Sequence, residues 1–200
     1  MPKAIIAVDL DGTLMRGDSF LSACAAAGAQ NIFVFIFKVF AGLAPLKWWM
    51  YRSLMNERSL KRIRWNEPLV KWLFEKQKEG AELILVSAAP DYFLEELKKH
   101  VGQGKLFAQM IGSTQNENRR GKAKANVLIA RFGRKGFDYV GNSQADVPVW
   151  RAARIAYNVN PSHGLERSAR AAGVSLTRIT RNPQHPLMEL WDDIKRALKK

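Results

Sequence analysis

Short apolar runs recur along the chain and predict buried β-strands. They cover residues 3–8 (KAIIAV), 81–87 (AELILVS), 137–141 (FDYVG) and 154–159 (RIAYNV), with a weaker fifth candidate at 174–179 (VSLTRI). Runs of this kind, rich in β-branched residues and without a regular polar alternation, are typical of strands that are covered on both faces, as in parallel sheets.

Helical patterns separate these runs. They lie at residues 67–80, 90–101, 124–133 and 145–154, and Gly80, Gly133 and Gly173 stand where helices are expected to stop. This alternation predicts an α/β fold, a doubly wound Rossmann-like parallel sheet. Ligands of such sheets bind at the carboxyl ends of the strands.

One segment breaks the alternation. Residues 18–65 have no strand pattern that fits it, and they predict a small helical cap inserted after the first strand. The expected domains are therefore a core of residues 1–17 and 66–200 and a cap of residues 18–65. Residues 185–200 predict a terminal amphipathic helix.

The cap contains an unusually apolar stretch, residues 32–51 (IFVFIFKVFAGLAPLKWWMY). It is nearly long enough to cross a bilayer. A crossing would place Asp9 and Asp11 on the opposite side from the later strand ends, so we reject it. Two interpretations stay open: a buried cap helix or dimer surface, and an interfacial element whose aromatic and basic residues suit an anionic membrane.

Composition narrows the expected partners and location. The 200 residues carry 32 Lys and Arg against 18 Asp and Glu, a formal net charge of +14. Such a balance favours an anionic partner: a phosphorylated substrate, an acidic membrane surface or nucleic acid. Cys24 is the single cysteine, so no internal disulfide can form, and the first residues do not resemble a signal peptide. We expect a cytoplasmic protein, with membrane-peripheral contact as an alternative.

Two aspartates stand where the first strand ends. Asp9 and Asp11 are two residues apart, and Gly12 and Thr13 follow them in a predicted turn that is a candidate phosphate-binding element. Two carboxylates held together are costly unless a cation joins them, and Mg²⁺ prefers hard oxygen ligands together with phosphate oxygens. A carboxylate at such a site can attack phosphorus, and a second one can transfer protons.

The other strand ends carry matching groups. The Ser87 hydroxyl and the Ala88 backbone N–H can hold a phosphate oxygen. Lys122 and Lys124 start a predicted helix, and either lysine could neutralise a phosphoryl group. Asn142 and Asp146 follow the strand at 137–141 as candidate metal ligands, with helix capping as the alternative for Asp146.

These motifs resemble the haloacid dehalogenase superfamily of phosphatases and phosphotransferases. DLDGT looks like its first motif, VSA like its second, the lysine before ANVL like its third and GNSQAD like its fourth. The phosphoserine-phosphatase-like branch is the most similar. RFGRKGFDYVGNSQADVPVWRAAR also resembles the domains of this superfamily that are fused to membrane prenyltransferases.

The resemblance implies roles for these residues. Asp9 would be the nucleophile and a Mg²⁺ ligand, and Asp11 the general acid and base, which binds Mg²⁺ through its backbone carbonyl. Ser87 would bind the phosphoryl group. Lys124 is the preferred lysine of the third motif, with Lys122 as its competitor. Asn142 departs from the family, which more often has aspartate there, and a neutral ligand would bind Mg²⁺ less tightly.

The expected function is a Mg²⁺-dependent phosphomonoester hydrolase with an aspartyl-phosphate intermediate. The expected substrate is a phosphorylated small molecule or a lipid-linked phosphate, and the sequence leaves this choice and the oligomeric state open. The alternative is a catalytically weak phosphate-binding protein or a regulatory protein at a membrane surface. Nucleic acid ranks below these partners, because no base-reading motif is present.

Overall fold

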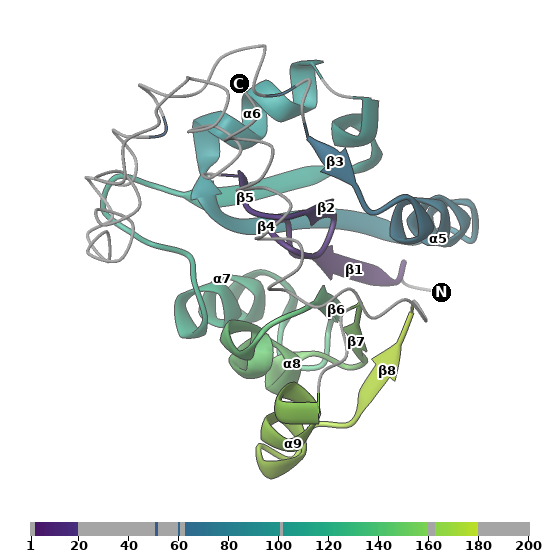
Figure 1. The fold of residues 1–200 in the computed structure, drawn as a ribbon, viewed down its shortest axis with the longest axis vertical. Coiled ribbons are helices and arrows are strands. Elements are labelled where there is room, and N and C mark those ends of the chain that lie inside the picture. Colours follow the sequence, from purple (N-terminus) through teal and green to yellow (C-terminus); the bar gives the residue numbers. More distant parts are fainter. Residues whose placement is uncertain are drawn as a thin grey trace, which may run out of the picture.

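The computed structural model describes residues 3–19, 51, 60, 63–100, 102–159 and 163–179. Its centre is a six-stranded sheet in the order β5-β4-β1-β6-β7-β8, in which every neighbouring pair is parallel. The six strands are β1 (Ile5–Val8), β4 (Glu82–Pro90), β5 (Gln109–Ser113), β6 (Asp138–Gly141), β7 (Ala156–Asn158) and β8 (Leu176–Arg178). The predicted doubly wound α/β fold is confirmed (Figure 1).

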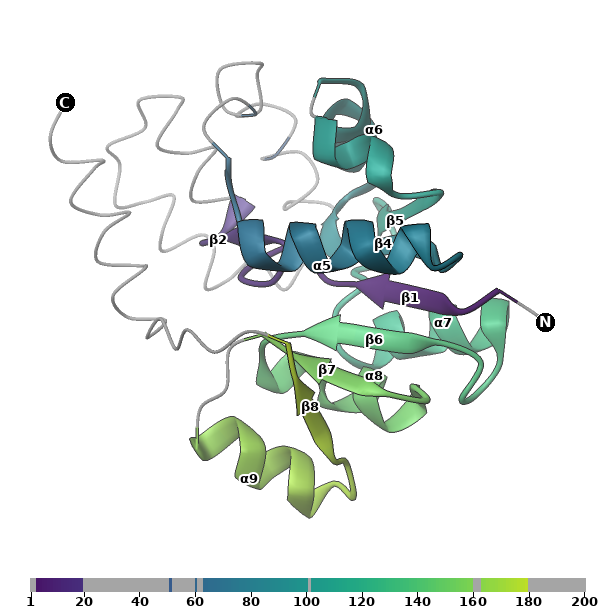
Figure 2. The ribbon, with the colours of Figure 1, turned by 90° about the vertical axis from the view of Figure 1, so that its right-hand side faces the viewer.

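Helices cover both faces of the sheet, as Figures 1 and 2 show. On one face lie α5 (Glu67–Lys78), α6 (Asp91–His100) and the short 3₁₀ helix η1 (Gly102–Leu106). On the other lie α7 (Lys122–Phe132), α8 (Val147–Ala152), which follows the 3₁₀ turn η2 (Gln144–Asp146), and α9 (His163–Ala171).

Alternation along the central strands builds the two cores. In β1, Ile6 and Val8 belong to the core under α5 and α6, whereas Ala7 belongs to the core under α7, α8 and α9. Successive side chains of a strand point to opposite faces, so a strand covered on both faces must be apolar throughout. This is the physical reason for the continuous apolar runs of the sequence.

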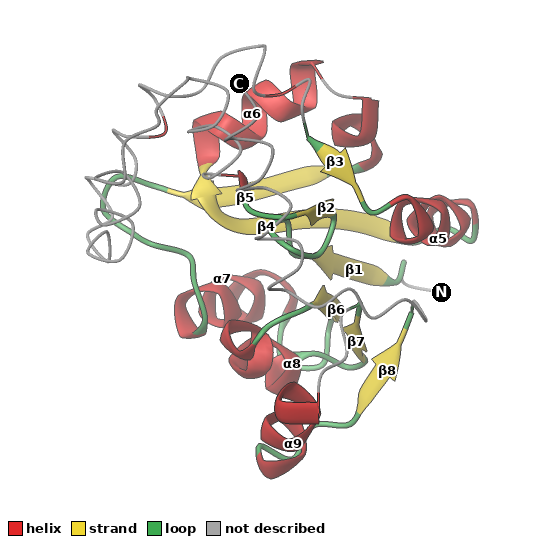
Figure 3. Cartoon of the chain, viewed as in Figure 1, coloured by secondary structure: helices red, strands yellow, loops and turns green. Residues whose placement is uncertain are grey.

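One strand and one helix of the main layers lie outside the sequence-based expectations. β5 is an edge strand with only Met110 and Ile111 as large apolar residues, and α9 turns little more than Leu165 and Ala169 toward the core. β5 is too short to show a clear alternation, and α9 has too few apolar residues to stand out as an apolar pattern. The alternation of strands and helices is otherwise close to the predicted one (Figure 3).

A second, two-stranded sheet lies beside the loop that follows β1. β2 (Met15–Arg16) pairs antiparallel with β3 (Arg64–Trp65), Met15 opposite Trp65 and Arg16 opposite Arg64. The chain therefore enters and leaves the expected cap segment, residues 18–65, at two neighbouring points of the core. Residues 64–65 form a strand where none was expected. Most of that segment and the expected helix at 185–200 lie outside the described residues.

Candidate active site

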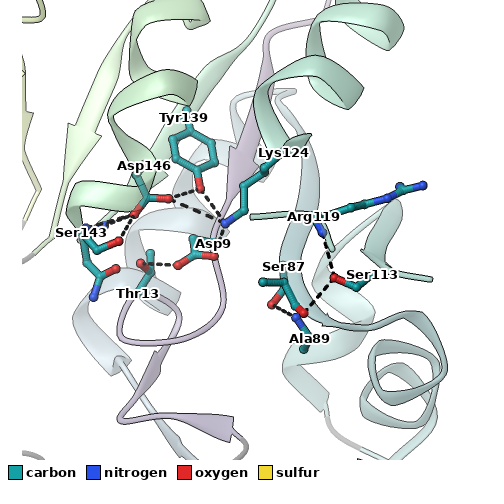
Figure 4. Close-up of polar contacts among 12 residues, drawn as sticks. Asp9, Thr13, Ser87, Ala89, Ser113, Arg119, Lys124, Tyr139, Ser143 and Asp146 are labelled. Carbon is teal, nitrogen blue, oxygen red and sulfur yellow. Dashed lines mark hydrogen bonds and ion pairs between the residues drawn. The ribbon is translucent and has the colours of Figure 1, made fainter. Parts of the chain in front are cut away.

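The predicted site residues meet at the carboxyl edge of the sheet. Asp9 follows the central strand β1, which pairs with β4 on one side and with β6 on the other. Ser87 lies in β4, Asn142 and Asp146 follow β6, and Lys124 extends from the first turn of α7 (Figure 4). The strand order thus gathers groups that are far apart in the sequence.

The side chain of Asp9 is nearly buried and is held by hydrogen bonds. Its side chain is 10% exposed, and its Oδ1 accepts a hydrogen bond from Lys124 Nζ at 2.5 Å. Thr13 Oγ1 donates to Asp9 Oδ2 at 3.3 Å, and the backbone N–H of Asp9 donates to the carbonyl of Val140 in β6 at 3.0 Å. The carboxylate therefore has a fixed position between β1 and β6.

Burial strongly affects the charge of this pair. It raises the pKa of Asp9 from 3.8 to about 7; Lys124 opposes the rise, whereas the nearby carboxylates of Asp146 and Asp11 add to it. Burial also lowers the pKa of Lys124, but the attraction of Asp9 and Asp146 outweighs this effect and the pKa of Lys124 is raised. Burial therefore favours the neutral form of Asp9, whereas the Lys124 ammonium favours its ionised form.

Lys122 and Lys124 have different surroundings. Lys124 is buried and contacts Asp9, whereas Lys122 is exposed at the first residue of α7. The structure thus brings only Lys124 into contact with the carboxylate.

Asp146 is surrounded by donors. Its Oδ2 accepts hydrogen bonds from the backbone N–H groups of Asn142 and Ser143 and from Ser143 Oγ, at 3.0–3.1 Å. Its Oδ1 accepts from the Tyr139 hydroxyl at 2.6 Å and lies 3.7 Å from Lys124 Nζ. Asp146 occupies the N-cap position of α8, but its side chain closes the turn at Ser143 instead of capping that helix.

Asn142 packs directly against the turn after β1. Gly12 has φ +72°, and a Cβ built on it would lie 2.2 Å from Asn142 Nδ2. Only glycine allows this approach together with this backbone conformation. The Asn142 amide therefore lies against the turn that carries Asp9 and Asp11.

Asp11 lies on the cap side of the same turn. It is half-buried, and its Oδ1 accepts a hydrogen bond from the backbone N–H of Ser19 at 2.7 Å. Ser19 Oγ in turn lies 2.7 Å from the Tyr51 hydroxyl. Asp11 thus connects the turn after β1 to the beginning of the expected cap.

Ser87 and Ala88 form a second polar segment, within the last part of β4. Ser87 Oγ is fully buried and accepts a hydrogen bond from the backbone N–H of Ala89 at 2.9 Å, so its own hydrogen can be donated to a ligand. Ser113 Oγ donates to the Ala88 carbonyl and accepts from the Arg119 N–H, both at 2.9 Å. The end of β4 is thereby fixed to the loop that leads to α7.

Sequence reasoning missed Tyr139 and Ser113, although both contact predicted site residues. Tyr139 stands within an apolar strand, where a buried hydroxyl needs a hydrogen-bond partner. Its place two residues before Gly141, on the same face of β6, is the signal that could have found it.

The structure does not show a ready-made metal centre. Within the part of the chain that is described, no three His, Cys, Asp or Glu side chains form a group that could hold a metal ion. A cation here would need amide or backbone oxygens in addition to carboxylates. Across the same residues, no helix combines the length and hydropathy needed to cross a membrane.

Fold and site together define a doubly wound α/β protein whose buried carboxylate and lysine meet at the carboxyl edge of a parallel sheet. The chain belongs to the haloacid dehalogenase-like hydrolase family, whose sequence pattern matches residues 6–151. It is therefore a hydrolase by family, and the expected superfamily is confirmed.

A curated relative and several solved structures are also similar to this chain. The uncharacterized protein y4nM of Sinorhizobium fredii (strain NBRC 101917 / NGR234) is 28% identical over 198 residues, which are 96% of this chain but 37% of that protein. The chain thus spans little more than a third of that relative.

The solved structures have lower identity and similar folds. A phosphoserine phosphatase in its apo form has a TM-score of 0.64 at 17% identity, covering 96% of this chain and 98% of its own. A phospho-aspartyl intermediate analogue of phosphoserine phosphatase has a TM-score of 0.61 at 16% identity, covering 96% and 99%. A protein of unknown function from Bordetella pertussis Tohama I also reaches 0.61 at 16% identity, covering 90% and 100%.

Proposed function

We propose that this protein is a Mg²⁺-dependent phosphatase that hydrolyses phosphomonoesters through an aspartyl-phosphate on Asp9. The observation that carries the proposal is the buried contact between Lys124 Nζ and Asp9 Oδ1 at 2.5 Å, at the same edge of the sheet as Ser87 in β4. The lysine favours the ionised form of a carboxylate that burial would otherwise neutralise, and an ionised carboxylate is the competent nucleophile.

The proposed reaction has two steps. A carboxylate oxygen of Asp9 attacks phosphorus, the bond from phosphorus to the ester oxygen breaks, and Asp11 gives its proton to the leaving alcohol. Asp11 then takes a proton from water, the resulting hydroxide attacks phosphorus, and orthophosphate leaves as Asp9 is restored. Lys124, Ser87 Oγ and the Ala88 N–H would neutralise and hold the phosphoryl oxygens throughout.

The residues present fit a Mg²⁺ ion, although their negative charge is reduced because Asn142 is neutral. Asp9, the Asp11 carbonyl and the Asn142 amide oxygen would hold it, since the Asn142 amide lies against the Gly12 turn. When bound, the ion would neutralise phosphoryl charge. The donors around Asp146 favour a role in holding Lys124 and the Asn142 turn over direct contact with the metal.

We further propose that residues 18–65 form a cap that selects the substrate. The pairing of β2 with β3 and the hydrogen bond from Ser19 to Asp11 support this, because they place both ends of the segment beside the acid–base residue. The resemblance to prenyltransferase-linked domains and the apolar residues 32–51 favour a lipid-linked phosphate and a peripheral contact of a cytoplasmic protein with anionic membrane. If the protein does not float with anionic vesicles, the proposed membrane contact is ruled out.

The test is hydrolysis of para-nitrophenyl phosphate with and without Mg²⁺, with Asp9→Asn as the control. We expect Mg²⁺-dependent release of phosphate that Asp9→Asn abolishes while its thermal unfolding stays cooperative. Release by Asp9→Asn at the wild-type rate would refute the mechanism.

A second candidate function is a phosphate-binding protein with little turnover. The neutral Asn142, where the family more often has a carboxylate, favours it. Binding of Mg²⁺ and orthophosphate in calorimetry, without hydrolysis of a broad panel of phosphate esters, would support this function over the phosphatase.

A further inference from the structure

Tyr139 is fully buried beneath the candidate site, in the middle of the sheet. It stands opposite Ala7 of β1 in the parallel pairing of β6 with β1. Its ring packs edge-on against Trp150 of α8, with ring centroids 6.5 Å apart. This contact fixes the ring, so its hydroxyl has a defined position.

The hydroxyl lies between two charged groups. It donates to Asp146 Oδ1 at 2.6 Å and its oxygen accepts from Lys124 Nζ at 3.1 Å. Lys124 Nζ and Asp146 Oδ1 are themselves 3.7 Å apart, beyond hydrogen-bond distance. Figure 4 shows the hydroxyl between Asp146 and the Lys124 ammonium, with Asp9 below the ammonium.

Asp146 cannot move toward Lys124, because hydrogen bonds on its far side hold its carboxylate in place. Its Oδ2 accepts three hydrogen bonds from the turn at Asn142 and Ser143. Gly141 closes the remaining space: a Cβ there would lie 2.7 Å from Asp146 Cγ and 2.9 Å from Tyr139 Cε1. The carboxylate and the phenol are therefore fixed acceptors for Lys124.

We propose that Tyr139 is a positioning residue, whose hydroxyl keeps Lys124 from pairing directly with Asp146 and directs its ammonium onto Asp9. This role rests on the proposed phosphatase function. Three acceptors surround the Lys124 ammonium: Asp9 Oδ1, the Tyr139 oxygen and Asp146 Oδ1. With the hydroxyl removed, the ammonium would move into the vacated space to pair with Asp146, and its contact with the nucleophile would lengthen.

The test is Tyr139→Phe, which removes one oxygen and keeps the ring against Trp150. Displacement of a catalytic group by about 1 Å can cost about a hundredfold in rate, so we expect kcat to fall about 10- to 100-fold. We expect KM to change less than about threefold, because Ser87 and Ala88 still hold the substrate phosphate. The assay is hydrolysis of para-nitrophenyl phosphate with Mg²⁺.

Tyr157→Phe is the matched control. Tyr157 lies in the next strand, β7, and its ring packs against Trp72 of α5, on the other face of the sheet. Loss of this hydroxyl is expected to leave kcat and KM unchanged. Thermal unfolding of both variants is measured alongside the kinetics.

Each outcome distinguishes the two proposals. Wild-type kcat in Tyr139→Phe, with an active wild type, overturns the positioning role and leaves the phosphatase standing. A rise in KM at constant kcat, or loss of cooperative unfolding in Tyr139→Phe, also overturns it, because the hydroxyl would then serve binding or stability. A wild type that releases no phosphate defeats the proposed function, and the positioning role with it.

Discussion

Lys124 and Lys122 illustrate how far two residues of one helix turn can differ. They start α7 two positions apart, yet one ammonium is buried against Asp9 and the other is exposed. The family resemblance favours Lys124, but the sequence keeps Lys122 as a competitor, because the choice depends on the orientation of α7 over the sheet. A tertiary contact between residues 115 positions apart makes the difference.

This difference predicts unequal effects of two alanine substitutions. Lys124→Ala removes the cation beside Asp9, the proposed nucleophile, and we expect kcat for para-nitrophenyl phosphate to fall at least about a hundredfold. Lys122→Ala is expected to retain activity within about twofold, since surface charges contribute little. Equal losses in the two variants would mean that both lysines serve the site.

Asn142→Asp tests whether the neutral side chain of this proposed ligand limits the binding of Mg²⁺. A unit charge about 4 Å from another gains about 1 kcal/mol even in water, so we expect Mg²⁺ to bind at least about fivefold more tightly. Calorimetric titration measures this without any turnover. An unchanged Kd would place the metal away from residue 142.

At the scale of elements, β6 connects the site to the core. Tyr139 and Gly141 lie on one face of it, and the glycine leaves room for the phenol and for Asp146. The sequence predicts this strand well, because it is apolar and ends in a motif. The sequence could not show that its tyrosine contacts the lysine, since that contact depends on how α7 and α8 pack.

Gly141→Ala is therefore expected to damage both stability and activity. Its Cβ would overlap Asp146 and Tyr139, and overpacking of this kind costs about 1–3 kcal/mol in the free energy of unfolding. Gly164→Ala in α9 is the control, because a Cβ there meets nothing within 4 Å. Chemical denaturation compares the two, and equal stabilities would show that the space around Gly141 can adjust.

At the scale of the whole molecule, the two edges of the sheet have separate roles. The site occupies the carboxyl edge, while an ion pair joins strands at the opposite edge: Arg154 donates to both oxygens of the buried Asp138 at 2.8 Å. Asp138 also accepts from the Ile155 N–H at 3.2 Å. This pair fixes the start of β6 to the turn before β7.

Arg154→Ala should therefore affect stability alone. We expect the free energy of unfolding to fall by about 1–2 kcal/mol, because among the described residues the buried carboxylate keeps the Ile155 N–H as its one donor outside Arg154. We expect kcat to stay unchanged, since no site residue moves. Denaturant titration and the phosphatase assay measure the two quantities, and a reduced kcat would show that the two edges are coupled.

The fold was easier to predict than the site. Apolar runs and helix periods specify β1, β4, β6 and β7 because those elements are covered on both faces. The edge elements β5 and β8 and the short β2 and β3 carry less local signal, since long-range pairing determines them. The motif residues that the sequence predicts meet at one edge of the sheet, whereas Ser113 acts through contacts that no local spacing encodes, and Tyr139 is signalled only by its place two residues before Gly141.

The strand order also determines how the molecule could be divided. The chain builds β1, β4 and β5 on one side and then crosses back through α7 to add β6, β7 and β8 on the other. A cut in the exposed loop at residues 115–117 would leave Asp9 and Ser87 in one fragment and Lys124 in the other. Because β1 and β6 pair with each other, the two fragments would meet along this strand pair. Neither fragment would hold a complete site. Hydrolysis would then report the reassembly of two separately made polypeptides, as in a split reporter enzyme.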